Sequence, residues 1–175
     1  MERLISLAQE NGFSCWAAAD LASFVPLPAV REMCRADRCG QYGKNWACPP
    51  HCGSIEQAAR EIGNYQRGLL VQTVGNLADE FDYDGMNRIA QEHKKRFRNF
   101  ARQARLVHPD CLPLTAGACS VCAKCTCPGR PCRFPGKRLV SMEAYGLWVS
   151  DVCARSGLLY NHGAKTVTYT ACVLF

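Results

Sequence analysis

The cysteines of this chain are concentrated in two short stretches. Of thirteen cysteines in 175 residues, nine lie within residues 34–52 and 119–132. The first stretch contains Cys34, Cys39, Cys48 and Cys52, and the second contains Cys119, Cys122, Cys125, Cys127 and Cys132. Both stretches are rich in glycine and proline, which predicts loops rather than helices or strands. The fold must therefore carry two thiol-rich loops on a core built from the rest of the chain.

These thiols are better metal ligands than disulfide partners. Residues 1–10 contain neither a basic leader nor an apolar segment long enough for secretion. No stretch approaches the roughly 20 apolar residues that cross a bilayer, so we expect no membrane partner and a cytoplasmic location. Thiols stay reduced in that compartment and can bind soft metals. The odd number of cysteines also prevents complete pairing within one chain.

The second stretch gives the sharper indication of which metal is bound. Its first three cysteines are each separated by two residues, a spacing similar to the run that wraps a [4Fe-4S] cluster in bacterial ferredoxins. We take Cys132 as the fourth ligand, because Cys125 and Cys127 would point to opposite sides of an extended backbone. Cys127 remains the alternative fourth ligand, since spacing alone does not decide between the two.

The first stretch supplies four further candidate ligands, Cys34, Cys39, Cys48 and Cys52. It contains no pair of cysteines separated by two residues, whereas zinc sites usually combine two pairs of closely spaced cysteines. We therefore predict one or two [4Fe-4S] clusters as cofactors, with structural zinc as the alternative. Glu143 is interpreted here as a residue that complements the dipole at the start of a helix.

Positive charge gathers in one part of the chain. Residues 94–138 contain eleven Lys or Arg and a single acid, while the rest of the chain contains ten basic and fourteen acidic residues. Such a segment could offset the negative charge of two clusters and dock an acidic redox partner protein. In the zinc alternative, its helical part would bind nucleic-acid phosphates or a protein partner. The oligomeric state is not indicated by the sequence.

No sequence motif indicates an enzyme. Neither a dinucleotide-binding glycine fingerprint nor a phosphate-binding loop is present. We expect a non-catalytic electron carrier or accessory protein. Under the iron–sulfur hypothesis, we expect no nucleic-acid partner. An enzyme with an incompletely ligated iron is a third hypothesis, which rests on the open question of the fourth ligand at the first site.

The rest of the sequence predicts a single α/β domain over residues 1–175, with metal loops at about 34–53 and 117–137. Strands are expected near 13–19, 68–74 and 166–175, together with a short one at 158–160. Helices are expected after Ser54, over 84–107, and from Ser141 to about Gly157. These elements would form a small mixed β-sheet flanked by helices, with both loops gathered at one end.

Several short motifs resemble one known family. They are Cys39–Pro50 (CGQYGKNWACPP), Pro131–Pro135 (PCRFP), Ser141–Gly146 (SMEAYG) and Thr166–Tyr169 (TVTY). In these motifs and their order, from about Phe13 to the C-terminus, the chain resembles the cysteine-rich prokaryotic proteins described as predicted metal-binding proteins of unknown function. The resemblance implies a metal-binding role for Cys34, Cys39, Cys48, Cys119, Cys122, Cys125 and Cys132. It does not include Cys52 or Cys127, which leaves the fourth ligand of the first site open.

Overall fold

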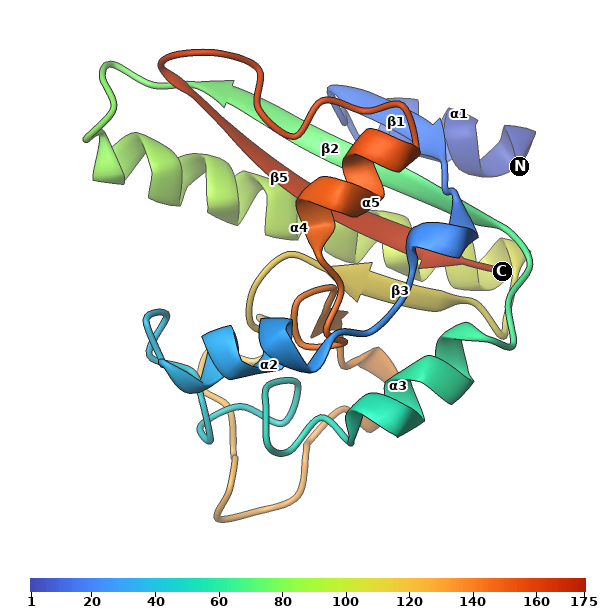
Figure 1. Cartoon of the computed structure of the whole chain (residues 1–175), viewed down its shortest axis with the longest axis vertical. Coiled ribbons are helices and arrows are strands. Elements are labelled where there is room, and N and C mark those ends of the chain that lie inside the picture. Colours follow the sequence, from blue (N-terminus) through green and yellow to red (C-terminus); the bar gives the residue numbers. More distant parts are fainter.

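The structure is a computed structural model that describes all 175 residues. Its helices are α1 (Glu2–Glu10), α2 (Pro28–Arg35), α3 (Ile55–Ile62), α4 (Tyr83–Val107) and α5 (Val149–Arg155). Its strands are β1 (Cys15–Ala18), β2 (Gly68–Asn76), β3 (Leu112–Thr115), β4 (Val140–Ser141) and β5 (Thr166–Leu174), with 3₁₀ turns η1 (Leu21–Ser23) and η2 (Pro135–Lys137). Figure 1 shows the order of these elements along the chain.

The five strands form one mixed sheet, as the sequence predicts. Their order is β1-β2-β5-β3-β4, with antiparallel pairs except between β3 and β4, which are parallel. The long central pair, β2 and β5, runs in register from Gly68 opposite Leu174 to Asn76 opposite Thr166. The sequence prediction did not include β3 and β4, which extend the sheet by one short strand and a two-residue strand.

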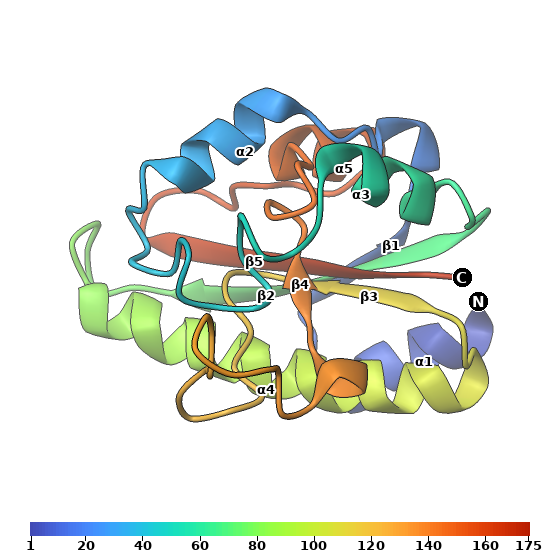
Figure 2. The ribbon, with the colours of Figure 1, turned by 90° about the horizontal axis from the view of Figure 1, so that it is seen from below.

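Helices cover both faces of the sheet. Figure 2 shows α1 and α4 on one side and α2, α3 and α5 on the other. Because successive strand residues point to opposite faces, Leu69 and Val71 pack with the α1 and α4 side, while Leu70 packs with the α5 side. Two hydrophobic clusters of 14 and 16 buried residues result, one on each face. The predicted arrangement of a sheet flanked by helices is confirmed.

Local sequence signals place two of the helices correctly. Ser54 and Gln57 form the predicted capping box at the start of α3: Ser54 Oγ accepts from the Gln57 N–H at 3.2 Å, and Gln57 Oε1 accepts from the Ser54 N–H at 2.7 Å. Helix α4 begins after Asp82, whose side chain accepts from the Gly85 N–H at 2.8 Å. Its apolar face is buried against the sheet, as the spacing of its apolar residues predicts.

The predicted helix from Ser141 is wrong in its first half. Ser141 belongs to β4, and the chain then turns before α5 begins at Val149. Gly146 has a φ of +81°, and its carbonyl oxygen accepts a hydrogen bond from the Leu27 N–H at 2.8 Å, so the chain leaves helical geometry there. Gly157 does follow the end of α5, with a φ of +75°. Residues 158–160 form no strand, contrary to the prediction.

No helix of the structure combines the length and the apolar composition that crossing a bilayer requires.

Candidate metal centre

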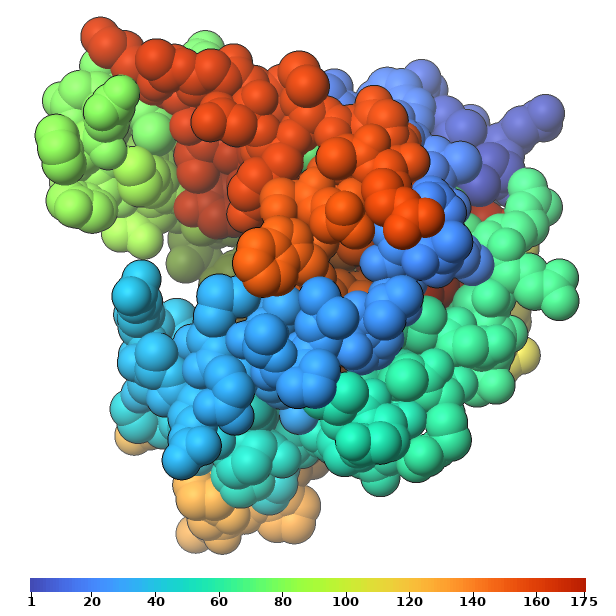
Figure 3. All heavy atoms as spheres, viewed as in Figure 1, coloured from blue at the N-terminus to red at the C-terminus, as the bar shows by residue number.

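The first cysteine loop connects α2 to α3. Cys34 lies in the last turn of α2, while Cys39, Cys48 and Cys52 lie in the loop that follows. Cys48 is buried, Cys34 and Cys52 are half-buried and Cys39 is exposed. Gly43 allows the loop to turn, because it has a φ of +68° that side chains rarely adopt. Figure 3 shows α2 and part of this loop at the surface of the molecule.

Three of the four predicted thiols line one pocket. Cys34, Cys39 and Cys48 face a cavity of about 380 Å³, which Glu143 also lines. This volume is more than ten times the roughly 30 Å³ that one water occupies in the liquid. The pocket therefore has room for a multi-atom group. Its other lining residues are Val30, Met33, Arg38, Tyr42, Pro49, Gly117, Ala118, Ser141 and Ala144.

Cys52, the fourth predicted ligand of this loop, is not among the residues that line the pocket. Arg31 Nη2 donates to its sulfur at 3.4 Å, and the same guanidinium donates to the carbonyl oxygens of Ala144 at 2.6 Å and Gly53 at 2.9 Å. Burial raises the pKa of the Cys52 thiol, and the charge of Arg31 opposes that rise. The structure thus places Cys52 in a hydrogen-bonded network beside the pocket.

The thiols of Cys34 and Cys48 are hard to ionise in this pocket. Burial, and after it the neighbouring thiols of Cys39, Cys52, Cys34 and Cys119, raise the pKa of Cys48 to about 12. Burial also raises the pKa of Cys34, with the nearby carboxyl of Glu143 as the next cause. These thiols are therefore protonated at neutral pH in the metal-free protein. Metal binding would have to release their protons, because the thiolate is the metal ligand.

Glu143 brings a carboxyl group to the pocket. It follows β4 and is half-buried, and its Oε2 is sealed from solvent without a hydrogen-bond partner. Burial raises the pKa of this carboxyl, while hydrogen bonds from its own backbone N–H, the Ser141 hydroxyl and the Gly117 N–H oppose the rise. Its interpretation as a dipole-complementing residue is wrong, because no helix begins there. No local pattern indicates its place in the pocket, which depends on the pairing of β4 with β3.

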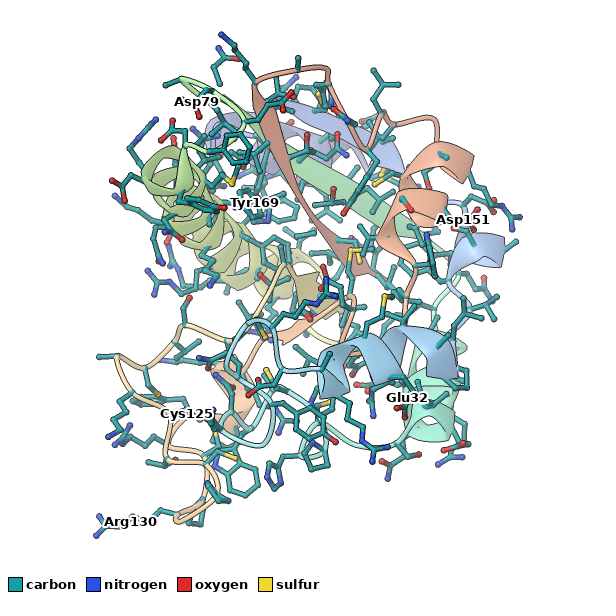
Figure 4. All side chains as sticks on the ribbon, turned by 60° about the vertical axis from the view of Figure 1, so that its left-hand side comes forward. Glu32, Asp79, Cys125, Arg130, Asp151 and Tyr169 are labelled. Atoms are coloured by element: carbon teal, nitrogen blue, oxygen red, sulfur yellow. The ribbon has the colours of Figure 1, made fainter.

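The second cysteine loop runs from β3 to η2. Its five cysteines are all half-buried, and only Cys119 packs against the hydrophobic core. Cys122, Cys125 and Cys132 do not line the pocket of the first loop. Figure 4 shows Cys125 within this loop and Arg130 at its outer end. The loop is closed by a hydrogen bond from Thr126 Oγ1 to the Pro131 carbonyl oxygen at 2.8 Å.

The two cysteine loops lie side by side, as predicted. Asn45 Nδ2 donates to the Cys119 carbonyl oxygen at 3.2 Å, and Trp46 Nε1 donates to that of Arg130 at 3.0 Å. Cys127, the alternative ligand of the second loop, has its sulfur 3.7 Å from the Gly43 carbonyl oxygen. These contacts join the first loop to both ends of the second.

The arrangement of donors bears on the kind of metal group that fits. No three or more Cys, His, Asp or Glu side chains converge tightly enough to hold one ion. A tetrahedral zinc site needs its sulfurs about 3.8 Å apart, since each Zn–S bond is about 2.3 Å long. A [4Fe-4S] cluster takes its thiolates at separate iron corners. Three thiols and the carboxyl of Glu143 thus line one pocket without forming a compact site for a single ion.

All thirteen cysteines are free thiols in this structure. Outside the loops, Cys111, Cys153 and Cys172 are buried, as expected for ordinary core residues, and Cys15 is half-buried. His51 packs edge-on against Trp46 with ring centroids 5.1 Å apart. These residues contribute packing rather than donors to the pocket.

Comparison with known proteins connects this geometry to a family. No curated protein and no solved structure matches the chain. A model of the family DUF2284, described as "predicted metal-binding protein", matches residues 20–175 and so covers both cysteine loops, Glu143 and all strands but β1. The chain therefore belongs to the DUF2284 family of predicted metal-binding proteins.

Proposed function

We propose that this protein binds one or two [4Fe-4S] clusters and transfers electrons to or from a partner protein. At the first site, Cys34, Cys39 and Cys48 would hold the cluster. A bound cluster would accept and release one electron at a time, which is the chemistry that such centres supply. The contribution of the chain is to gather soft donors, exclude part of the solvent and present the site near the surface.

One observation carries the proposal, namely the convergence of three thiols on one pocket. Cys34 comes from a helix and Cys39 and Cys48 from the loop after it, yet all three line the same 380 Å³ cavity. Burial raises the pKa of Cys48 to about 12, so ionising this thiol in the absence of a metal is unfavourable. A bound cationic centre would offset the cost of ionisation.

The second loop would hold the second cluster. Cys119, Cys122 and Cys125 have the spacing of a ferredoxin run, and Cys132 or Cys127 would complete the set. The hydrogen bonds of Asn45 and Trp46 keep this loop beside the first, so the two sites would be neighbours. Electrons would enter at one site and leave at the other.

The partner would approach the outer end of the second loop. Lys124, Arg130 and Arg133 are exposed there, and none of them takes part in an ion pair. An acidic partner surface would complement these charges and speed the encounter. The association should therefore weaken as the ionic strength rises.

Metal analysis of anaerobically purified protein tests the proposal. We expect iron and acid-labile sulfide in about equal amounts, a broad visible absorption that bleaches with dithionite, and an electron paramagnetic resonance signal after reduction. In Cys48→Ser, the iron content should fall by about half if two clusters are present, or be lost if there is one. Cys172→Ser is the matched control, because this buried thiol lies in β5 away from both loops and should leave the iron content unchanged.

A colourless protein that contains zinc and no iron would refute the iron–sulfur proposal. Equal loss of iron in the Cys48 and Cys172 variants would refute the assignment of the first site, because it would show that iron retention follows global stability.

A further inference from the structure

A second pocket lies between α4 and the end of the second cysteine loop. It has a volume of about 410 Å³, and Arg98, Arg102 and Arg105 of α4 line it together with Lys137 of η2. The other lining residues are Asn99, Ala101, Val121, Gly136 and Leu139. Figure 2 shows α4 and this part of the loop next to each other on the same side of the sheet. None of the thiols of the candidate metal centre lines this pocket.

The charges of this pocket are uncompensated. The three arginines are spaced by four and three residues, so they share one face of α4. No acidic residue lines the pocket, and none of its four cations forms an ion pair. Arg98 donates only to the Ser120 carbonyl oxygen, at 3.1 Å. By contrast, Arg96 on the same helix is paired with Glu92. Four unpaired cations around one cavity create a strong local positive potential.

The pocket also offers an apolar surface. Ala101 and Leu139 are buried and Val121 is half-buried, so carbon atoms lie among the charged groups. Pockets of roughly 300–1,000 Å³ that combine apolar lining with a few converging polar groups are typical of small-molecule sites. Arginine is also suited to phosphate, since its planar guanidinium can donate two parallel hydrogen bonds to phosphate oxygens.

We propose that this pocket binds a small phosphorylated molecule. Its phosphate group would lie among Arg98, Arg102, Arg105 and Lys137, and its less polar part would contact Ala101 and Leu139. A concave site favours a compact ligand over a nucleic-acid backbone, which needs cations spread along an extended path. The acidic excess outside residues 94–138 also opposes the approach of a long polyanion. The site goes beyond the proposed electron transfer and does not depend on the metal.

Calorimetric titration of the purified full-length protein with inorganic pyrophosphate tests this assignment. We expect saturable binding with a stoichiometry of one, weakened at least tenfold in the double variant Arg102→Gln/Arg105→Gln. Lys137→Gln, which changes the opposite wall of the pocket, should weaken binding severalfold and provides a second test if the double variant does not fold. The matched control is Arg88→Gln/Lys95→Gln, which removes the same charge from exposed positions of α4 outside the pocket and should change affinity less than twofold.

Three results would overturn the proposal. The first is the absence of pyrophosphate binding to the wild-type protein at low salt. The second is an equal loss of affinity in the pocket and control variants, which would mean that net charge alone attracts the anion. The third is tighter binding of a single-stranded DNA oligonucleotide than of pyrophosphate, with the same sensitivity to the pocket variants, which would identify an extended nucleic-acid surface instead.

Discussion

Replacing His93 should remove a large part of the acid sensitivity of this fold. His93 lies on α4 with no exposed surface, and its ring is near the rings of Phe13, Phe97 and Tyr169. Its Nδ1 is 3.0 Å from Thr73 Oγ1, and its Nε2 is buried without a partner. Burial lowers its pKa to about 3 from the ordinary 6.5, and the charges of Arg96 and Lys94 add to this effect.

The dependence of stability on pH follows from the difference between the pKa of His93 in the folded state and in the unfolded chain. Because the folded state binds this proton more weakly than the unfolded state, the stability that depends on neutral His93 is fully present above pH 6.5 and is lost as the pH falls toward 3. His93 has a pKa of about 3 in the folded state and about 6.5 in the unfolded chain. At pH 5 this difference lowers the free energy of unfolding by about 2 kcal/mol. The loss of unfolding free energy would reach about 4 kcal/mol at pH 3, a large share of the stability of a typical domain.

Urea unfolding at pH 7.5 and pH 5.0 measures this contribution. We compare the wild type with His93→Gln, whose side chain is polar but does not titrate. Between the two pH values, the free energy of unfolding of the variant should fall by about 2 kcal/mol less than that of the wild type, whatever the stability of the variant at pH 7.5. The comparison cancels other titrating groups, including the carboxyl of Glu143, because both proteins contain them. If the two proteins lose the same free energy on acidification, the burial argument for His93 is refuted.

Three further changes test individual features of the fold. Gly146→Ala should destabilise the protein by about 1–3 kcal/mol in urea unfolding, because its φ is +81° and an added Cβ would approach backbone atoms to 3.1 Å; Gly129→Ala, with nothing within 4 Å, should be nearly neutral. Ser54→Ala should cost about 1 kcal/mol through loss of the cap on α3, and an unchanged urea midpoint would contradict this role. Asn45→Ala should speed tryptic cleavage between 120 and 134, since its bond to the Cys119 carbonyl is lost; unchanged cleavage would argue against this link.

Local signals in the sequence predict the framework of this fold well. The capping box at Ser54, the apolar spacing of α4 and the β-branched alternation of β5 each depend on residues close together in the chain. The predicted helix from Ser141 fails because a distant partner decides the structure there. Ser141 pairs with Thr115 in the parallel β3–β4 ladder, and no pattern within residues 141–157 indicates this partner.

In the candidate site too, some positions can be predicted from local spacing and others depend on distant residues. Cys34, Cys39 and Cys48 line one pocket, as closely spaced residues of one loop must stay near each other, while their role as metal ligands stays a prediction. The environment of Cys52 depends on Arg31, whose guanidinium spans two separate segments. The position of Glu143 depends on the β-sheet. These residues come from parts of the chain whose proximity only the tertiary structure reveals.

The hydrogen bonds that join the two cysteine loops do not depend on the side chains of the accepting residues. The donors are side chains of Asn45 and Trp46, and the acceptors on the second loop are main-chain carbonyl oxygens. Every amino acid supplies such an acceptor, so substitutions at the accepting positions need not break the junction. Positions of the second loop other than its cysteines can therefore change side chain while the first loop continues to anchor the loop.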